Sequence, residues 1–256
     1  MKKELRIFFT ALMFYTRIPC PKWVDHSEDY LNKATRYLPL IGWIVGAFNV
    51  LIIYVCSFIF PKSICVIMAL GASVLLTGAF HDDGYADLCD GFGGGWTKSQ
   101  ILEIMKDSRV GTYAVVGLIL LIFLKIFILI TLIEYELLFC LKSIVLAHIL
   151  SRWSVTTIIF THNYSRDDGI SKVKPIAKKL TLTNLIVSSL WVVPILFLFQ
   201  SWLIFLVIPI VYLMKVYLAR YFQKRIGGYT GDCLGATQQI NEILTLLFCL
   251  LLWKFI

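Results

Sequence analysis

The chain has 256 residues, of which 59% are hydrophobic and 16% are charged, and its formal net charge is +8. Soluble globular proteins carry about 25% charged residues, so this composition excludes an ordinary soluble domain and indicates an integral membrane protein. The basic residues alternate along the chain and do not form one patch, so we expect no nucleic-acid partner.

The first apolar segment, residues 7–15, is too short to span a bilayer. It lacks the small-residue cleavage site of a signal peptide, so we expect an amphipathic helix at the membrane interface. Later stretches of about 20 apolar residues predict about seven transmembrane helices. These predicted spans are residues 37–60, 63–81, 110–133, 137–161, 182–200, 201–221 and 233–256.

The predicted fold is therefore an all-α polytopic membrane bundle, and residues 1–256 form one domain because no repeat or linker is found. Lysine and arginine concentrate in alternate loops. By the positive-inside rule, the N-terminus and the long loops near 81–112, 162–179 and 220–232 are cytoplasmic, and the C-terminus is external. We expect the protein in the cytoplasmic (inner) membrane. Seven scattered cysteines without a C-x-x-C pair argue against a disulfide framework or a zinc site.

An acidic segment, residues 81–91, follows the second predicted span. If it is helical, Asp83, Asp87 and Asp90 lie at i, i+4 and i+7, within roughly a 60° sector of the helix surface. Carboxylates this close repel one another unless a cation is bound, and oxygen ligands of this kind suit Mg²⁺. The pattern predicts a site for magnesium and a diphosphate, and a solvated acidic loop is the alternative.

Glycines and charged residues continue this segment as far as residue 112. Gly84 and Gly91 would let the backbone approach a bulky ligand closely. Asp107 lies between two cations and is a candidate metal ligand, while Lys106 and Arg109 are candidate clamps for phosphate oxygens. Ordinary positive-inside anchoring is the alternative role of the two cations.

The last predicted span begins after a second glycine-rich, acidic segment, residues 227–232. A helix N-terminus near Thr230 and Gly231 can receive an anion, and Asp232 is alternatively the N-cap of that helix. Polar residues then recur at i, i+3, i+4 and i+7, and we expect this stripe to line the site or to form a hydrogen-bond network within the bundle. The stripe consists of Gln238, Asn241, Glu242 and Thr245.

Two basic residues lie well inside predicted spans. Arg152 is a candidate for contacting substrate, because a cation at membrane depth indicates function. Lys125 either has such a role or extends its amine toward the interface. The loop at 162–179 contains Asp167 and Asp168, and it either meets a polar ligand or presents a basic surface to anionic lipid.

The segment 81–91 reads H-D-D-G-Y-A-D-L-C-D-G and resembles the pattern H-x-D-G-x-A-D-x-x-D-G of the cobalamin synthase family, the adenosylcobinamide-GDP ribazoletransferases. Asp82 occupies a variable position, so it is not taken as a ligand. Ala114 departs from the glycine more usual in the family. The resemblance extends to residues 15–19, 37–42, 104–112, 151–153 and 227–236.

The resemblance implies a transferase of cobalamin biosynthesis that uses Mg²⁺. It would transfer the cobinamide-phosphate group of adenosylcobinamide-GDP to α-ribazole or its 5′-phosphate, giving adenosylcobalamin or its 5′-phosphate and GMP. Asp83, Asp87 and Asp90 would be the metal ligands, and the role of Asp107 and Asp232 stays open between a second metal site and a general base. The candidate substrate-binding residues are His81, Gly84, Gly91, Lys106, Arg109, Arg152, Thr230, Gly231, Gln238 and Glu242.

Other membrane proteins also use spaced aspartates. A CDP-alcohol phosphotransferase expects an Ala-Arg pair, but Asp87 follows Ala86 here. A prenyltransferase is a further diphosphate-using alternative. A divalent-cation transporter would more naturally bury its carboxylates at mid-membrane within broken spans. The expected partners are the two substrates and membrane lipid, and a second copy of the chain stays open as a partner.

Overall fold

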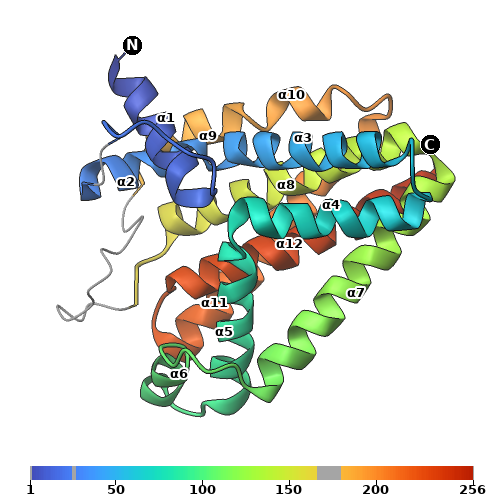
Figure 1. Cartoon of the computed structure of the whole chain (residues 1–256). Helices are drawn as coiled ribbons and strands as arrows, with labels where there is room; N and C mark the ends of the chain where they lie inside the picture. The colour runs from blue at the N-terminus through green and yellow to red at the C-terminus, as the bar shows by residue number, and fades with distance from the viewer. Residues whose placement is uncertain (1, 25–26, 166–179, 256) are drawn as a thin grey trace.

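The computed structural model describes residues 2–24, 27–165 and 180–255, and regular structure in these ranges is helical (Figure 1). This confirms the predicted all-α class. The part of the basic loop that contains Asp167 and Asp168 lies outside the described residues. The helices are α1 (Lys2–Tyr15), α2 (Glu28–Ala34), η1 (Thr35–Tyr37), α3 (Leu38–Cys56), α4 (Lys62–Thr77), α5 (Phe80–Gly94), α6 (Lys98–Ile104), α7 (Thr112–Tyr135), α8 (Leu137–Thr161), α9 (Leu182–Leu190), α10 (Val193–Leu196), η2 (Trp202–Leu206), α11 (Val207–Ile226), α12 (Gly231–Leu252) and η3 (Trp253–Phe255).

Within the described chain, five helical segments are long and apolar enough to cross a membrane, and a sixth is added if the bent pair α4–α5 is one span. The number is lower than the predicted seven, mainly because residues 182–200 do not form one helix. There α9 ends at Leu190, and the four-residue α10 has Pro194 in its first turn. Proline lacks an amide hydrogen and clashes with the preceding turn, so it interrupts a long helix. The short N-terminal helix α1 is present as expected.

The chain turns sharply between α4 and α5, whose axes differ by 89°. Gly78 and Ala79 both adopt left-handed backbone conformations there, with φ of 63° and 57°. The side chain of Arg17 packs against Gly78. The backbone amide of Arg17 donates to the Leu76 carbonyl oxygen at 2.7 Å. The bend directs α5 downward in Figure 1, at about a right angle to α4, instead of continuing along α4.

Helix α8 is buried along most of its length and forms the centre of the bundle. A Cβ at Gly42 of α3 would lie 2.5 Å from the His148 carbonyl oxygen, so only glycine permits this close helix contact. On the α12 side, the Asn241 side-chain amide donates to the Ser154 hydroxyl at 3.0 Å. Helix α8 therefore contacts both α3 and α12, and it brings its polar side chains next to the polar stripe of α12.

Two of the loops that were expected on one membrane face meet in the described structure. The Ser165 amide donates to the Tyr229 carbonyl oxygen at 2.8 Å, and the Tyr229 amide donates to the Asn163 carbonyl oxygen at 3.1 Å. Arg225, near the end of α11, donates to the carbonyl oxygen of Gly95 at 2.8 Å. The ends of α5, α8 and α11 thus lie together, as the charge pattern predicts.

Candidate functional site

The acidic segment is helical throughout α5, so Asp83, Asp87 and Asp90 have the i, i+4, i+7 spacing that the sequence predicts. Asp83 is exposed, and the other two are half-buried. Among the described residues, no group of three or more His, Cys, Asp or Glu side chains is arranged to hold a metal ion. The donor set nevertheless fits Mg²⁺, because this ion is usually bound by one or two carboxylates and completes its shell with water and substrate phosphate.

Asp90 connects α5 to the beginning of α7. Its carboxylate accepts hydrogen bonds from the amides of Gly111 at 2.6 Å and Ala114 at 2.9 Å. A Cβ at Gly111 would lie 2.6 Å from the Asp90 Oδ1 atom, so a larger residue would displace the carboxylate. A carboxylate at a helix N-terminus is favoured by the unpaired amides and by the helix dipole. Asp90 therefore fixes the start of α7 and has fewer lone pairs left for a metal.

The close crossing of α5 and α12 brings the two acidic motifs together. A Cβ at Gly84 would lie 3.0 Å from the Cα of Asp232, and a Cβ at Gly235 would lie 3.2 Å from the Cα of Gly84. Gly84 is buried at this contact. Asp87 is three residues beyond Gly84 and shares its side of α5. The missing side chain of Gly84 thus permits close packing of two helices, and it places Asp232 beside the acidic face of α5.

Thr230, not Asp232, is the N-cap of α12. The hydroxyl of Thr230 accepts from the Cys233 amide at 3.3 Å and donates to Asp232 Oδ2 at 3.3 Å. The alternative that Asp232 is the N-cap is therefore wrong, since the helix begins at Gly231. Gly231 is exposed and Thr230 is buried. Asp232 lies in the first turn, where a carboxylate is favoured by the helix dipole.

The loop between α6 and α7 presents its charges to solvent. Arg109 donates to both carboxylate oxygens of Asp107, with the closest nitrogen at 2.6 Å, and this bonding lowers the pKa of Asp107 to about 2. Lys106 is exposed. Gly91 packs against Met105, so α5 supports the helix that precedes this loop. The loop adjoins the acidic helix through Asp90, which binds the end of the loop at Gly111.

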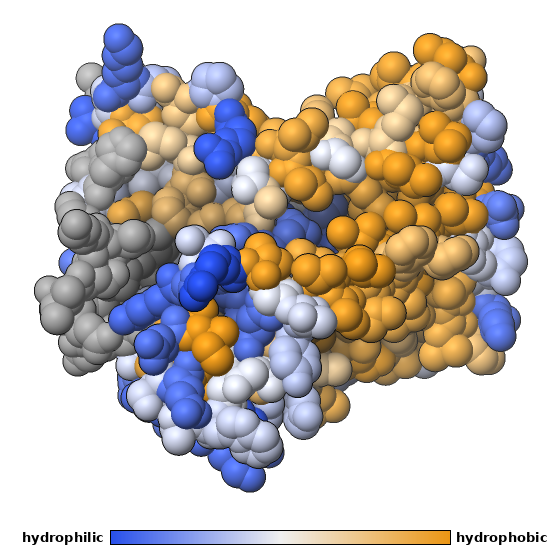
Figure 2. All heavy atoms as spheres, turned by 60° about the horizontal axis from the view of Figure 1, so that its bottom comes forward, coloured by the Kyte–Doolittle hydropathy of each residue, from blue (hydrophilic) through white to orange (hydrophobic). Residues whose placement is uncertain are grey.

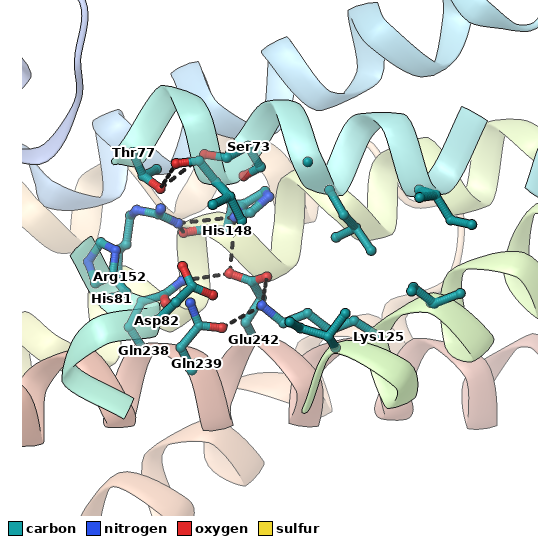
Figure 3. A pocket seen from close by; sticks show the side chains of 16 residues that line it. Ser73, Thr77, His81, Asp82, Lys125, His148, Arg152, Gln238, Gln239 and Glu242 are labelled. Carbon is teal, nitrogen blue, oxygen red and sulfur yellow. Dashed lines mark hydrogen bonds and ion pairs between the residues drawn. The ribbon is translucent and has the colours of Figure 1, made fainter. Parts of the chain in front are cut away.

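A cavity of about 260 Å³ lies on the other side of α5, between α4, α7, α8 and α12. Figure 3 shows its polar side chains pointing toward one another, with His81 and Asp82 of α5 among them. One wall is apolar. The cavity is lined by Ile67, Leu70, Gly71, Ser73, Val74, Thr77, His81, Asp82, Ile122, Lys125, Ile126, His148, Arg152, Gln238, Gln239 and Glu242.

Glu242 is the centre of a buried ionic network in this cavity. Its carboxylate lies 2.7 Å from the Lys125 amine and 3.1 Å from Nδ1 of His148, and it accepts from the Gln238 amide at 2.6 Å. The Lys125 amine also donates to Gln239 at 2.5 Å. Lys125 is 6% exposed, so its charge is paired inside the bundle and its side chain does not extend to the interface.

The polar stripe of α12 forms hydrogen bonds with α8, as one of the two alternatives predicts, and two of its residues, Gln238 and Glu242, also line the cavity. Arg152 on α8 is 2% exposed and places one guanidinium nitrogen 3.1 Å from Nδ1 of His148. In the described structure, Nε of Arg152 and Oε1 of Gln238 are buried and have no hydrogen-bond partner. A buried polar group without a partner is costly, and both atoms belong to residues that line the cavity.

Several cavity residues are missed by the sequence analysis. His148 and Gln239 are not among its candidates, and Asp82 is set aside because its position in the family pattern is variable. A histidine within a predicted span is a usable signal, since ionisable residues at membrane depth usually face an interior cavity. The segment 15–19, which shares the family resemblance, contacts the site directly, because Tyr15 stacks on His81 with ring centroids 6.4 Å apart.

Comparison with known proteins gives a consistent result. The sequence model of a family described as cobalamin-5-phosphate synthase matches residues 7–250. A protein of Shewanella amazonensis named adenosylcobinamide-GDP ribazoletransferase is 45% identical over 99% of this chain and 98% of its own length. A protein of Shewanella frigidimarina with the same name is 43% identical over 94% of this chain and 92% of its own length. No solved structure matches the chain.

Proposed function

Because the chain belongs to the cobalamin-5-phosphate synthase family, we propose that it is the transferase that joins adenosylcobinamide-GDP to a ribazole, giving a cobalamin and GMP. The acceptor is α-ribazole or its 5′-phosphate. The other expected classes, a CDP-alcohol phosphotransferase or prenyltransferase and a cation transporter, are not favoured, since relatives that share nearly the whole chain carry the ribazoletransferase name.

The observation that carries this proposal is the crossing of α5 and α12. The glycine contact between Gly84 and Gly235 places Asp232 beside the face that bears Asp83 and Asp87. Two acidic, glycine-rich motifs, about 150 residues apart in the sequence, thus lie at one place. An arrangement of carboxylates on facing helices suits a metal-bound diphosphate, whose charge must be neutralised for transfer.

We assign Mg²⁺ binding to Asp83 and Asp87. Mg²⁺ held there would neutralise the charge of the diphosphate and of the departing GMP. Asp90 positions the loop at 106–111 through the amides at the start of α7. That loop carries Lys106 and Arg109, whose positive charges would attract the phosphate oxygens.

In the reaction, a ribose hydroxyl of the ribazole attacks the phosphorus atom next to cobinamide. A new phosphorus–oxygen bond forms, the anhydride bond to GMP breaks, and the hydroxyl proton passes to a base. We assign this base to Asp232, because the alternative, Asp107, has a pKa of about 2 and is paired with Arg109. A carboxyl group of such low pKa is a weak proton acceptor at neutral pH.

The protein is a multi-pass membrane protein by the number of apolar helices in its described part. We propose that it lies in the cytoplasmic membrane with the acidic site on the cytoplasmic side. The basic loops support this orientation, as does the chemistry, because nucleotide substrates are charged and soluble. The apolar surface toward the right of Figure 2 and the hydrophilic surface toward its lower left fit such a placement.

The test is to incubate the purified protein in lipid nanodiscs with adenosylcobinamide-GDP, α-ribazole 5′-phosphate and Mg²⁺. Mass spectrometry should detect GMP and the joined corrinoid in equal amounts, and a chelator should stop their formation. A folded sample that forms neither product at any Mg²⁺ concentration contradicts the proposal.

A further inference from the structure

The cavity inside the bundle is separate from the acidic face of α5, although the same helix borders both. His81 and Asp82 line the cavity, whereas the next residue, Asp83, is exposed. The cavity and the proposed metal site therefore border the same turn of α5. This inference rests on the proposed function, and it concerns which substrate occupies the cavity.

The cavity has the size of a small aromatic molecule. A cavity of about 150 Å³ holds a benzene ring, and this one has a volume of about 260 Å³. A bicyclic ring with part of a sugar fits such a volume, but a corrin macrocycle does not. The size therefore favours the smaller of the two substrates.

The two walls of the cavity differ in chemistry. The α4 and α7 wall is mainly apolar and includes Leu70, Ile122 and Ile126. The opposite wall, from α8 and α12, is polar and includes Arg152, Gln238 and Glu242. A ligand with apolar ring faces and with both acceptor and donor groups at its edge would satisfy both walls.

Charge also restricts the ligand. Lys125 is paired with Glu242, so its amine is already neutralised. Arg152 lies beside His148, and Asp82 lines the same cavity. The two cations Lys125 and Arg152 are thus matched by the two carboxylates Glu242 and Asp82, and the cavity has no excess positive charge for a diphosphate. An uncharged group is the better occupant.

We propose that this cavity binds the benzimidazole nucleoside part of the ribazole acceptor. The benzimidazole ring has two apolar faces, which suit the α4 and α7 wall, and one free ring nitrogen that accepts a hydrogen bond from the polar wall. The sugar extends past His81 toward the metal site on α5.

The cavity opens on the apolar surface between α4 and α7. Ile67, Val74 and Ile122 line it and are also exposed, so they border its mouth. On the face shown in Figure 2, hydrophilic atoms lie at the bottom of a hollow between apolar lobes. An aromatic nucleoside with an apolar base can reach this mouth from the membrane side of the protein.

Gly71 allows a direct test, because it lines the cavity on α4, is exposed, and a Cβ added to it would meet no neighbouring atom within 4 Å. In Gly71→Phe the ring occupies the mouth, while the helix tolerates the change since glycine is a poor helix former. The matched controls are Gly71→Ala, which leaves the mouth open, and Leu75→Phe, on the lipid-facing side of the same helix, where the native side chain is 78% exposed.

The first measurement is equilibrium binding of α-ribazole to each variant in nanodiscs, without the corrinoid substrate. We expect Gly71→Phe to weaken binding by about 10-fold or more, and both controls to bind as the native protein does. Equal weakening in Leu75→Phe, or unchanged binding in Gly71→Phe, would overturn the inference.

Steady-state kinetics separate this inference from the proposed function. Gly71→Phe should raise the KM for α-ribazole and leave the KM for adenosylcobinamide-GDP unchanged. A rise in the KM for adenosylcobinamide-GDP instead would place the corrinoid in the cavity and contradict the inference. If the native protein binds α-ribazole but forms no product, the proposed function fails and the binding site stands.

Discussion

The two sides of α5 differ in the charged groups that they carry. On the side that bears the proposed metal ligands, Asp83 and Asp87 share one face of α5, and Asp232 packs beside Gly84. On the cavity side, Glu242 and Asp82 are matched by Lys125 and Arg152. Carboxylates on one helix face suit a bound Mg²⁺, whereas a charge-balanced cavity suits an uncharged group. One helix can therefore border the binding sites of a charged diphosphate and of an uncharged nucleoside group at the same time.

The largest effect is expected on the acidic side. Asp87→Asn should lower turnover by about 1,000-fold, because it removes a carboxylate that holds the cation opposite the developing charge. The melting temperature should stay near that of the native protein, since the side chain keeps its size. Turnover at saturating Mg²⁺ and thermal unfolding measure the two effects.

The matched control for that variant is Asp29→Asn, on α2, where an exposed carboxylate pairs with Lys33. This change should leave turnover unaltered. Near-native turnover of Asp87→Asn would remove Asp87 from the metal site and weaken the contrast between the two sides of α5.

The next largest effect is expected on the cavity side, and there it concerns stability. Glu242→Gln leaves the buried Lys125 amine without its carboxylate, and breaking a buried pair costs about 3 kcal/mol of unfolding free energy. The double variant Lys125→Met, Glu242→Gln should recover much of this loss, because the unpaired charge is gone. Denaturant-induced unfolding in detergent measures the unfolding free energy of both variants. A Glu242→Gln variant as stable as the native protein would show that the pair of Lys125 and Glu242 does not stabilise the fold.

The smallest effect separates the role of Asp90 from that of its neighbours. Asp90→Asn should reduce stability by about 1 kcal/mol, because its side chain accepts from the amides at the start of α7 and an amide group replaces one accepting oxygen. The Mg²⁺ concentration that gives half-maximal turnover should not change. A large increase in that concentration would make Asp90 a metal ligand instead of a positioning residue.

Helices that depend only on the local pattern of apolar and polar residues could be predicted from the sequence. The spacing of Asp83, Asp87 and Asp90 is realised in α5, and α8 coincides with a predicted span. The single span predicted at 182–200 is wrong, and Pro194 is the local signal that the prediction did not use, because proline disrupts a helix interior. Local features of this kind need no knowledge of the rest of the chain.

Other features depend on contacts between distant segments and could not be predicted. Ala79 has a left-handed conformation that is unfavourable for a residue with a side chain, and the bend it forms packs against Arg17. The pairing of Lys125 with Glu242 joins α7 to α12. Neither contact has a signature in the local sequence, so the division of α5 into two sides emerges only in the folded chain.

The most direct test of this division is to measure the binding of each substrate in nanodiscs with and without a chelator. We expect adenosylcobinamide-GDP to lose affinity when Mg²⁺ is removed, because its diphosphate binds on the acidic side of α5. We expect α-ribazole to bind equally well in both conditions, because its benzimidazole lies in the charge-balanced cavity. If α-ribazole also requires Mg²⁺, or if neither substrate does, the proposed division of α5 into two sides is contradicted.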